Sequence, residues 1–439
     1  IIGLGKTGIS LAKHLSKSNN NLFIYESSLN SKSLKELKDM DVDFVLNPEF
    51  SERAIDSISV IYPSPGISQD HEILKSAKDF NIPVQTDMDI YLNNSSSFKI
   101  LITGTNGKTT TACMLEHILK EHLKDKSVEV MGNIGKPVLD FLDKKIDVAI
   151  IEISSFQIES CSKLNSDIGI LLNIEEDHLD RHKSFNIYRS LKRRVLAESK
   201  INISYKEQQI NDKKFYDFED YFSEFDFSNN PALKNWPTHD ISNLKAALLA
   251  TALTIKCIEK NAVSDLNNFL SRSLERMVSF SKKAHRFEII EDEDGVLHIN
   301  DSKATNFSAT VQSIESSSKL NKEGDIYLLC GGDFKSQSID KVKATIFNDI
   351  KRCFIFGKDK KILEELLSDF TDCICCDNLD DAYFLAKQES IKGDIILLSP
   401  ACASTVSYTH LRAHETRVEL VCRLLRVKKM WGGGGGGGA

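Results

Sequence analysis

A short apolar segment that runs into a glycine-containing turn constrains this chain most strongly. Residues 98–102, FKILI, are almost wholly apolar, which is typical of a strand buried in a parallel sheet. The turn GTNGKTT follows within two residues, and a helical pattern begins beyond it. Backbone N–H groups of such a turn can face a phosphate, and the start of the helix favours anions. The segment predicts an α/β nucleotide-binding domain.

The spacing in this turn differs from the usual phosphate-binding loop, Gly-x-x-x-x-Gly-Lys-[Ser/Thr]. That pattern requires a glycine six residues before Lys108, where Ile102 stands instead. In a phosphate loop Lys108 would reach the β- and γ-phosphates, and the Thr109 hydroxyl would bind Mg²⁺. The turn alone leaves open both a shorter phosphate loop and an ordinary strand–helix turn.

Composition limits the class of protein. A chain of 439 residues with 41% hydrophobic and 27% charged residues is typical of a soluble protein of two to four domains. Its net charge of −7 argues against a protein that attracts nucleic acid, and we see no uninterrupted apolar run of about 20 residues for a membrane span. Ten scattered cysteines fit a reducing cytoplasm. We expect neither a nucleic-acid nor a membrane partner.

Short apolar strands alternate with helical patterns in three successive regions, which predicts three α/β domains. The expected boundaries are 1–94, 95–284 and 285–404. The chain opens inside a strand without Met, so we expect a truncated N-terminus. Residues 405–439 carry six Lys/Arg against two Asp/Glu and end in a glycine run, and we interpret them as a non-native tail.

Two further strands of the second region end in polar groups. DVAIIEI places Glu152 at the carboxyl end of an apolar strand, where ligands of parallel sheets bind and where a carboxylate could hold Mg²⁺. LLNI is followed by EEDHLDRH, which includes Asp177, His178 and Asp180. A solvent-facing acid and an exposed polar loop are the alternative explanations.

The first region begins with GLGKTG, which fits the pattern Gly-x-Gly-x-x-Gly. Glu26 ends the next predicted strand. This pattern is a dinucleotide fingerprint and leaves an NAD-dependent oxidoreductase open, although any close strand–helix turn fits it. In the third region, NDSKATN and GGDFKS suggest a site for an anionic substrate. DCICCD, with Cys373, Cys375 and Cys376, is interpreted as a buried strand, with zinc as the alternative.

Seven motifs together are more specific than any one of them. GTNGKTT, EISSFQ, DHLDRH, HRFE, NDSKATN, GGDFKS and LSPACAS occur in this order. The set resembles the Mur ligases, most closely the member that adds D-glutamate, and single motifs are shared with folylpolyglutamate synthases. The resemblance implies a Rossmann-like N-terminal domain, a central P-loop ATPase domain with a parallel sheet, and a Rossmann-like C-terminal domain. It implies a cytoplasmic, monomeric enzyme that uses ATP and two Mg²⁺ ions.

The resemblance also assigns residues. It gives a catalytic role to Lys108, Glu152, His178 and Lys192. It gives ATP binding to the loop and four later side chains: Gly104, Thr105, Asn106, Gly107, Lys108, Thr109, Thr110, Asn243, His285, Arg286 and Asp301. It gives metal binding to Thr109, Glu152, His178 and carbamylated Lys192.

The implied substrates are UDP-N-acetylmuramoyl-L-alanine and D-glutamate, joined as an amide through an acyl phosphate. The UDP side takes Lys6, Thr7, Glu26, Ser64, Pro65, Gly66, Asn133 and His178. D-glutamate takes Lys303, Thr305, Lys335 and Ser404. The sequence departs from the family after LSPACAS, where the tail replaces a segment that encloses D-glutamate. Another Mur ligase, a folylpolyglutamate synthase-like ligase and an inactive binding protein remain alternatives.

Overall fold

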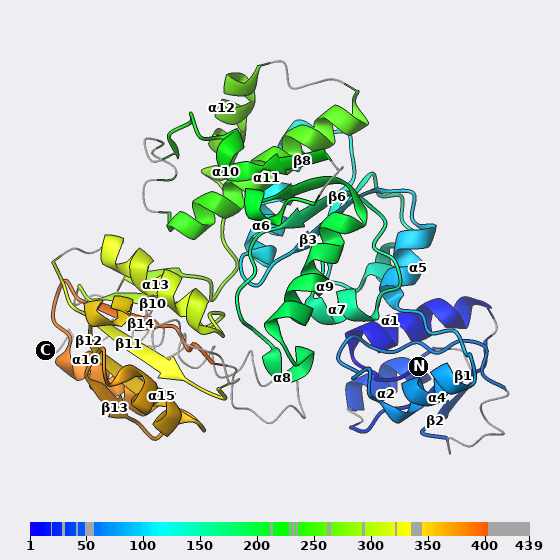
Figure 1. Ribbon diagram of the computed structural model, residues 1–439, viewed down its shortest axis with the longest axis horizontal. Helices are drawn as coiled ribbons and strands as arrows, with labels where there is room; N and C mark the ends of the chain where they lie inside the picture. Colours follow the sequence, from blue (N-terminus) through cyan, green and yellow to red (C-terminus); the bar gives the residue numbers. More distant parts are fainter. Residues whose placement is uncertain are drawn as a thin grey trace, which may run out of the picture. The chain divides into compact units, whose positions relative to one another are not determined.

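The computed structural model describes most of the chain between residues 1 and 402. The described ranges are 1–18, 20–28, 31–40, 43–48, 57–210, 214–227, 230, 233, 236–260, 265–291, 295–320, 323–334 and 345–402. These residues form two compact units (Figure 1). The first comprises 1–174, 186–234 and 240–280, and the second comprises 175–185, 235–239 and the described part of 281–439. The expected tail, 405–439, lies outside the described residues.

The N-terminal part of the first unit is a small parallel α/β layer. Strands β1 (Leu22–Ile24) and β2 (Phe44–Leu46) pair in parallel, and Ile2 forms bridges to Tyr25 and Pro63. The glycine-rich turn lies between Ile2 and the first helix. The helices around this layer are α1 (Lys6–Leu15), α2 (Ser31–Lys38), α4 (Glu72–Asp79) and α5 (Asp87–Asn94).

The rest of the first unit is built on a six-stranded parallel sheet in the order β4-β5-β3-β6-β7-β8. Its strands are β3 (Phe98–Thr103), β4 (Val128–Gly132), β5 (Val148–Glu152), β6 (Ser166–Leu171), β7 (Ser199–Ser204) and β8 (Lys214–Asp217). Its helices are α6 (Lys108–His122), α7 (Ser155–Ser160), α9 (Phe185–Ala197), α10 (Phe218–Tyr221), α11 (Thr238–Ile258) and α12 (Leu266–Met277). β3 is central, so its carboxyl end is flanked by the ends of β5 and β6.

One face of this sheet forms a core with helices from both parts of the first unit. Leu101 and Ile151 of the sheet pack with Met88 of α5, Ile158 of α7 and Val195 of α9. Apolar side chains at alternate positions of β3 and β5 produce this face. The same core therefore fixes α5, α7 and α9 around one end of the sheet.

Helix α11 is rich in alanine and leucine. By length and composition it could cross a membrane, but 61% of its apolar window is buried inside the fold. It is a core helix of the protein, because its apolar side chains already have protein partners.

The second unit contains a six-stranded sheet in the order β13-β12-β11-β14-β10-β9. Its strands are β9 (Glu288–Glu291), β10 (Leu297–Asn300), β11 (Ile326–Gly331), β12 (Ile350–Phe356), β13 (Cys373–Cys375) and β14 (Ile395–Leu398), of which β9 alone is antiparallel. Helices α13 (Phe307–Leu320), α15 (Lys360–Leu367) and α16 (Leu379–Glu389) contribute to its two cores. The short α8 (Leu179–His182) also belongs to this unit.

The cysteine segment differs in part from its interpretation as a buried strand. Cys373–Cys375 is a strand, but β13 is the edge of its sheet, so Cys373 and Cys375 are only half-buried. Within the described parts of the chain, no group of three or more His, Cys, Asp or Glu side chains is arranged to hold a metal ion.

Candidate phosphate-binding site

The turn after β3 has the conformation that an anion site at a helix N-terminus requires. Helix α6 begins at Lys108, and its N-cap, Gly107, has a left-handed φ of 83°. A Cβ added at Gly107 would lie 2.3 Å from the Asn243 Oδ1 atom of α11, so a larger residue is excluded. Glycine thus lets the backbone turn into α6 while Asn243 packs against it. The predicted loop residues Gly104, Thr105, Asn106, Thr109 and Thr110 all lie in this turn or in the first turn of α6.

Two lysine side chains converge on the same loop carbonyl. Lys108 Nζ donates to Gly104 O at 2.7 Å and to Thr105 O at 2.8 Å. Lys192 Nζ, from α9, donates to Gly104 O at 2.8 Å, and only 2% of Lys192 is exposed. Two ammonium groups on one oxygen repel each other and make the neighbourhood favourable for a negatively charged ligand.

Glu152 lies at the end of β5, beside the first turn of α6. It is 2% exposed. Its Oε2 accepts from the Thr109 hydroxyl at 2.8 Å, and its Oε1 accepts from the Asn133 amide at 2.7 Å. Among the residues that the structure describes, no cation pairs with this carboxylate. A buried carboxylate with two neutral donors is costly unless a cation binds to it.

These groups fit Mg²⁺, which prefers carboxylate and hydroxyl oxygens together with phosphates and water. Glu152 and Thr109 supply one oxygen type each and lie in contact. Because they are few, a magnesium ion here would depend on oxygens of a bound nucleotide. The geometry therefore suits a metal–nucleotide complex better than a closed protein cage.

Two residues that support the loop were not predicted as site residues. Asn173, just after β6, accepts from the Asn106 N–H at 2.8 Å and donates to Asn106 O at 3.1 Å. The Tyr188 hydroxyl of α9 lies 3.1 Å from the Thr105 hydroxyl, and the Lys192 ammonium lies 4.7 Å from the centre of the Tyr188 ring. Asn173 directly follows an apolar strand, which was the available sequence signal, whereas nothing local marked Tyr188.

The N-terminal turn brings together most residues predicted for the UDP side. Lys6 and Thr7 are the first residues of α1. The Ser64 hydroxyl donates to Gly3 O at 2.9 Å, and Pro65 and Gly66 come next in the chain. Glu26 does not project freely, because its Oε2 accepts the Leu4 N–H at 2.6 Å and its Oε1 accepts the Ser28 N–H at 3.0 Å. The carboxylate predicted for the UDP side thus closes the turn. Asn133 lies apart from this group, on Glu152.

His178 belongs to the second unit, where it has a left-handed φ of 55°. Its Nε2 lies 3.5 Å from the Asp177 carboxylate, which is buried. The structure does not describe the side chain of Asp180.

Three residues predicted for ATP lie together in the second unit. His285 Nδ1 lies 3.0 Å from the Asn300 amide, and Asp301 accepts from the Phe287 N–H at 3.2 Å and from the Ser313 hydroxyl. Burial raises the pKa of Asp301, an effect that Ser313 and the charges of His239 and Arg286 oppose. The short turn after β10 holds this group in place.

The residues predicted for D-glutamate are only partly described. Lys303 is exposed, and Thr305 donates its N–H to Lys303 O at 3.0 Å. Lys335 and Ser404 lie outside the described residues.

Comparison with protein families finds Mur ligase domains over most of the chain. Residues 1–86 match the Mur ligase MurD-like N-terminal domain, residues 102–234 the Mur ligase middle domain, and residues 285–402 the Mur ligase glutamate ligase domain. A relative from Buchnera aphidicola is 33% identical, and the match covers 97% of each chain. One from Rickettsia felis is 32% identical and covers 97% of this chain and 96% of its own. Both are named UDP-N-acetylmuramoylalanine–D-glutamate ligase.

Solved structures share the fold at low sequence identity. The MurF ligase of Thermotoga maritima, solved with ADP, has a TM-score of 0.54 and 16% identity, and 97% of each chain is covered. A pseudomurein peptide ligase of Methanothermus fervidus has a TM-score of 0.55 and 17% identity, with 96% of this chain and 99% of that chain covered. FolC of Escherichia coli, solved with DHPP and ADP, has a TM-score of 0.51 and 17% identity over 76% of this chain and 92% of its own. These likenesses show a common three-domain fold.

Proposed function

Because this chain belongs to the Mur ligase family, we propose that it joins D-glutamate to UDP-N-acetylmuramoyl-L-alanine in an ATP-dependent, ADP-forming reaction of peptidoglycan synthesis. The choice of D-glutamate rests on relatives that match almost end to end and carry that activity in their names. The part of the proposal that concerns ATP rests on one structural observation. The Thr109 hydroxyl hydrogen-bonds to buried Glu152 beside the loop that ends at Lys108.

The reaction must make a poor electrophile reactive. The terminal carboxylate of the UDP substrate attacks the γ-phosphorus of ATP, the bond to ADP breaks, and an acyl phosphate forms. The amine of D-glutamate then adds to the acyl carbon, a proton leaves the nitrogen, and phosphate departs to leave the amide. Each step gathers oxyanions, so fixed positive groups and oriented N–H donors lower the barrier.

The residues of the phosphate-binding site suit this task. Lys108 would move from the loop carbonyls to the phosphates, and the start of α6 would offer backbone N–H groups to them. Thr109 and Glu152 would hold a Mg²⁺ ion, which supplies Lewis-acid stabilisation of phosphate charge when bound. Asn243 would keep the loop backbone in position from α11.

We assign Lys192 a second metal-related role. Carbamylation would replace its ammonium by a carboxylate and remove the repulsion from Lys108 at Gly104 O. That carbamate would bind a second Mg²⁺ ion, and we separately assign His178 to metal binding. The test compares the mass of the intact protein with and without bicarbonate, and Lys192→Met serves as the control. We expect bicarbonate to add the mass of one carbamate to the wild type alone.

The remaining assignments complete the proposal. Lys6, Thr7 and Ser64–Gly66 would bind the UDP group, Asn133 the sugar side, and His285, Arg286 and Asp301 the nucleotide. Lys303, Thr305, Lys335 and Ser404 would receive D-glutamate. We infer a monomeric enzyme working in the cytoplasm.

The decisive assay measures ADP release with UDP-N-acetylmuramoyl-L-alanine, D-glutamate, ATP and Mg²⁺. We expect turnover that needs all four and that falls at least about 1,000-fold in Lys108→Met. L-glutamate, a diamino acid and a folate acceptor replace the natural substrates in parallel, and turnover with one of these alone would assign a different ligase.

A second arm of this assay tests the proposed non-native character of residues 405–439. The same measurement is made on a variant in which residues 405–439 are replaced by the corresponding segment of the Buchnera relative. An inactive original chain with an active variant would assign the defect to the tail, whereas two inactive proteins would refute the proposed activity.

A further inference from the structure

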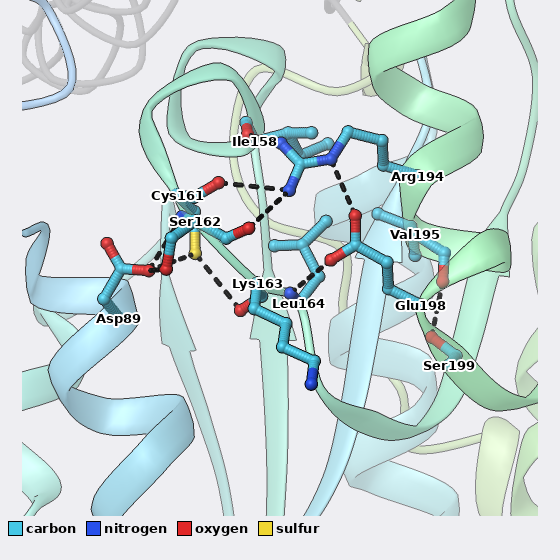
Figure 2. A network of polar contacts seen from close by, with 10 residues as sticks. All are labelled: Asp89, Ile158, Cys161, Ser162, Lys163, Leu164, Arg194, Val195, Glu198 and Ser199. Atoms are coloured by element: carbon cyan, nitrogen blue, oxygen red, sulfur yellow. Dashed lines mark hydrogen bonds and ion pairs between the residues drawn. The ribbon is translucent and has the colours of Figure 1, made fainter.

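The segment 161–164, between α7 and β6, is held by charged side chains from two helices (Figure 2). On one side, Arg194 of α9 donates to Ile158 O at 2.7 Å, to Cys161 O at 3.1 Å and to Ser162 O at 3.2 Å. These carbonyls belong to the last turn of α7 and the residues that follow it. One guanidinium thus satisfies groups that a helix end leaves without intrahelical partners.

Glu198, the residue directly after α9, orients this guanidinium. Its Oε1 accepts from Arg194 Nε at 2.7 Å, and its Oε2 accepts from the Leu164 N–H at 2.6 Å (Figure 2). Arg194 therefore binds carbonyls at the start of the segment, and Glu198 binds the N–H of its last residue. The planar guanidinium suits this task because its donors have a fixed geometry.

On the other side, Asp89 of α5 holds the same segment. Its Oδ1 accepts from Ser162 N at 2.8 Å, from the Ser162 hydroxyl at 2.6 Å and from Cys161 Sγ at 3.2 Å. These hydrogen bonds, together with those from Thr86, lower the pKa of Asp89 against the opposing effect of burial. Among the described residues, Asp89 hydrogen-bonds to Thr86, Cys161 and Ser162 and to no residue of α9, so the two sides can be altered separately.

The side held by α9 connects directly to the phosphate-binding site. Lys192 lies two residues before Arg194, and its ammonium donates to Gly104 O at 2.8 Å. Tyr188, one turn earlier, contacts Thr105. At the other end of the connection, α7 begins three residues after Glu152. Arg194 therefore joins the helix that carries Lys192 to the helix that starts behind Glu152.

We propose that Arg194, oriented by Glu198, is a positioning residue that sets the rotation and axial position of α9 and so fixes Lys192 at the loop. It touches no predicted substrate position and acts only through Lys192 and Tyr188. The expected effect on ADP release rests on the function proposed above, whereas the positioning of Lys192 does not.

The test compares Arg194→Met with Arg193→Met, a matched control on the same helix. Arg193 is a neighbouring arginine whose hydrogen bond to Gln209 O is 3.5 Å long. In Arg194→Met we expect kcat for ADP release to fall about 10- to 100-fold, with KM for the UDP substrate changed less than about twofold. Arg194→Lys, which keeps a donor, restores part of kcat, and Arg193→Met matches the wild type.

A second measurement reads the position of Lys192 without turnover. The folded proteins are treated with acetic anhydride in bicarbonate-free buffer, which keeps Lys192 as a free amine, and acetylation of Lys192 is followed by mass spectrometry. Because 2% of Lys192 is exposed in the intact protein, we expect its acetylation rate to rise at least about fivefold in Arg194→Met and in the milder Glu198→Gln, but not in Arg193→Met.

Asp89→Asn separates positioning from general loosening of the segment. It weakens the hold on residues 161–164 from α5 and leaves the α9 contacts in place. The proposal requires that Asp89→Asn leave the Lys192 acetylation rate within about twofold of wild type. Equal effects of Asp89→Asn and Arg194→Met, or an unchanged Lys192 rate in Arg194→Met, would overturn it. If the wild type fails to ligate D-glutamate but the acetylation pattern holds, only the proposed reaction is refuted.

Discussion

At the scale of a residue, Glu152 combines a cost in stability with a role in function. Its carboxylate is buried, and its donors, Thr109 and Asn133, are both neutral. In Glu152→Gln the new amide oxygen can accept from Asn133, and the Thr109 hydroxyl can rotate to accept from the new NH₂. The substitution thus removes a buried charge while it keeps two hydrogen bonds.

We therefore expect Glu152→Gln to leave the metal-free protein as stable as the wild type, or up to about 1 kcal/mol more stable, while ADP release falls at least about 100-fold. Thermal melts in EDTA measure the first effect, and melts with Mg²⁺ and ATP test whether the stabilisation by ligand is lost. A variant that unfolds easily but still turns over would show that Glu152 is only a structural residue.

The contrast between predicted and unpredicted site residues has a physical reason. Lys108, Thr109 and Glu152 could be predicted, because parallel strands bring their carboxyl ends to one edge: Glu152 ends β5, and Lys108 and Thr109 begin the helix after β3. Tyr188 and Arg194 act from α9 on loops far away in the chain. Their roles depend on how α9 packs, which no local pattern encodes.

At the scale of elements, the packing of α6 on α12 contains a half-buried histidine. His122, at the end of α6, lies 2.9 Å from the Ser273 hydroxyl, and its ring centre is 4.9 Å from that of Phe269. Ser273 donates to Phe269 O, so the His122 Nε2–H donates to Ser273. Burial, aided by nearby Arg272 and opposed by Glu121, lowers the pKa of His122 to about 4.

This shift makes the α6–α12 contact sensitive to acid. The pKa is about 4 in the folded state against 6.5 unfolded, so the unfolded chain binds the extra proton first as the pH falls. Stability is unaffected above pH 6.5 and decreases between pH 6.5 and 4. Because the ring is partly exposed, we expect a loss of roughly 1 to 2 kcal/mol rather than the roughly 3 of the full shift.

Urea unfolding at pH 7.5 and 5 measures this loss. His122→Gln keeps a donor to Ser273 and cannot titrate, so its stability should vary less with pH than that of the wild type. His117→Gln removes another histidine of α6 and is the control. If His122→Gln and His117→Gln showed the same pH dependence as the wild type, the acid sensitivity would have to come from other groups.

Elements were predictable where burial imposes a pattern. The apolar strands β3 and β5 were expected from the sequence and are present. The more polar segment that contains β8 and α10 shows no such pattern. β8 is an edge strand with half-exposed residues, so neither full burial nor strict alternation marks it.

At the scale of the whole molecule, alternating strands and helices predicted the fold class, and the family match confirms it. The sequence could not predict how many units the chain forms, because that depends on contacts between domains. In the structure, the N-terminal part shares a core with the central sheet through α5, whereas the second unit has cores of its own. Separate cores allow separate unfolding.

This division predicts two thermal transitions that respond to different mutations. Leu101 of β3 is fully buried in the first unit, and Leu328 of β11 is fully buried in the second. Each Leu→Ala change should cost about 2 to 5 kcal/mol, because it removes buried methyl groups and leaves a cavity. By calorimetry, Leu101→Ala should lower the midpoint temperature of one transition and Leu328→Ala that of the other. Each variant should leave the midpoint of the other unit's transition within about 2 °C of the wild type. A single transition that both variants lower equally would mean that the two units unfold as one cooperative body.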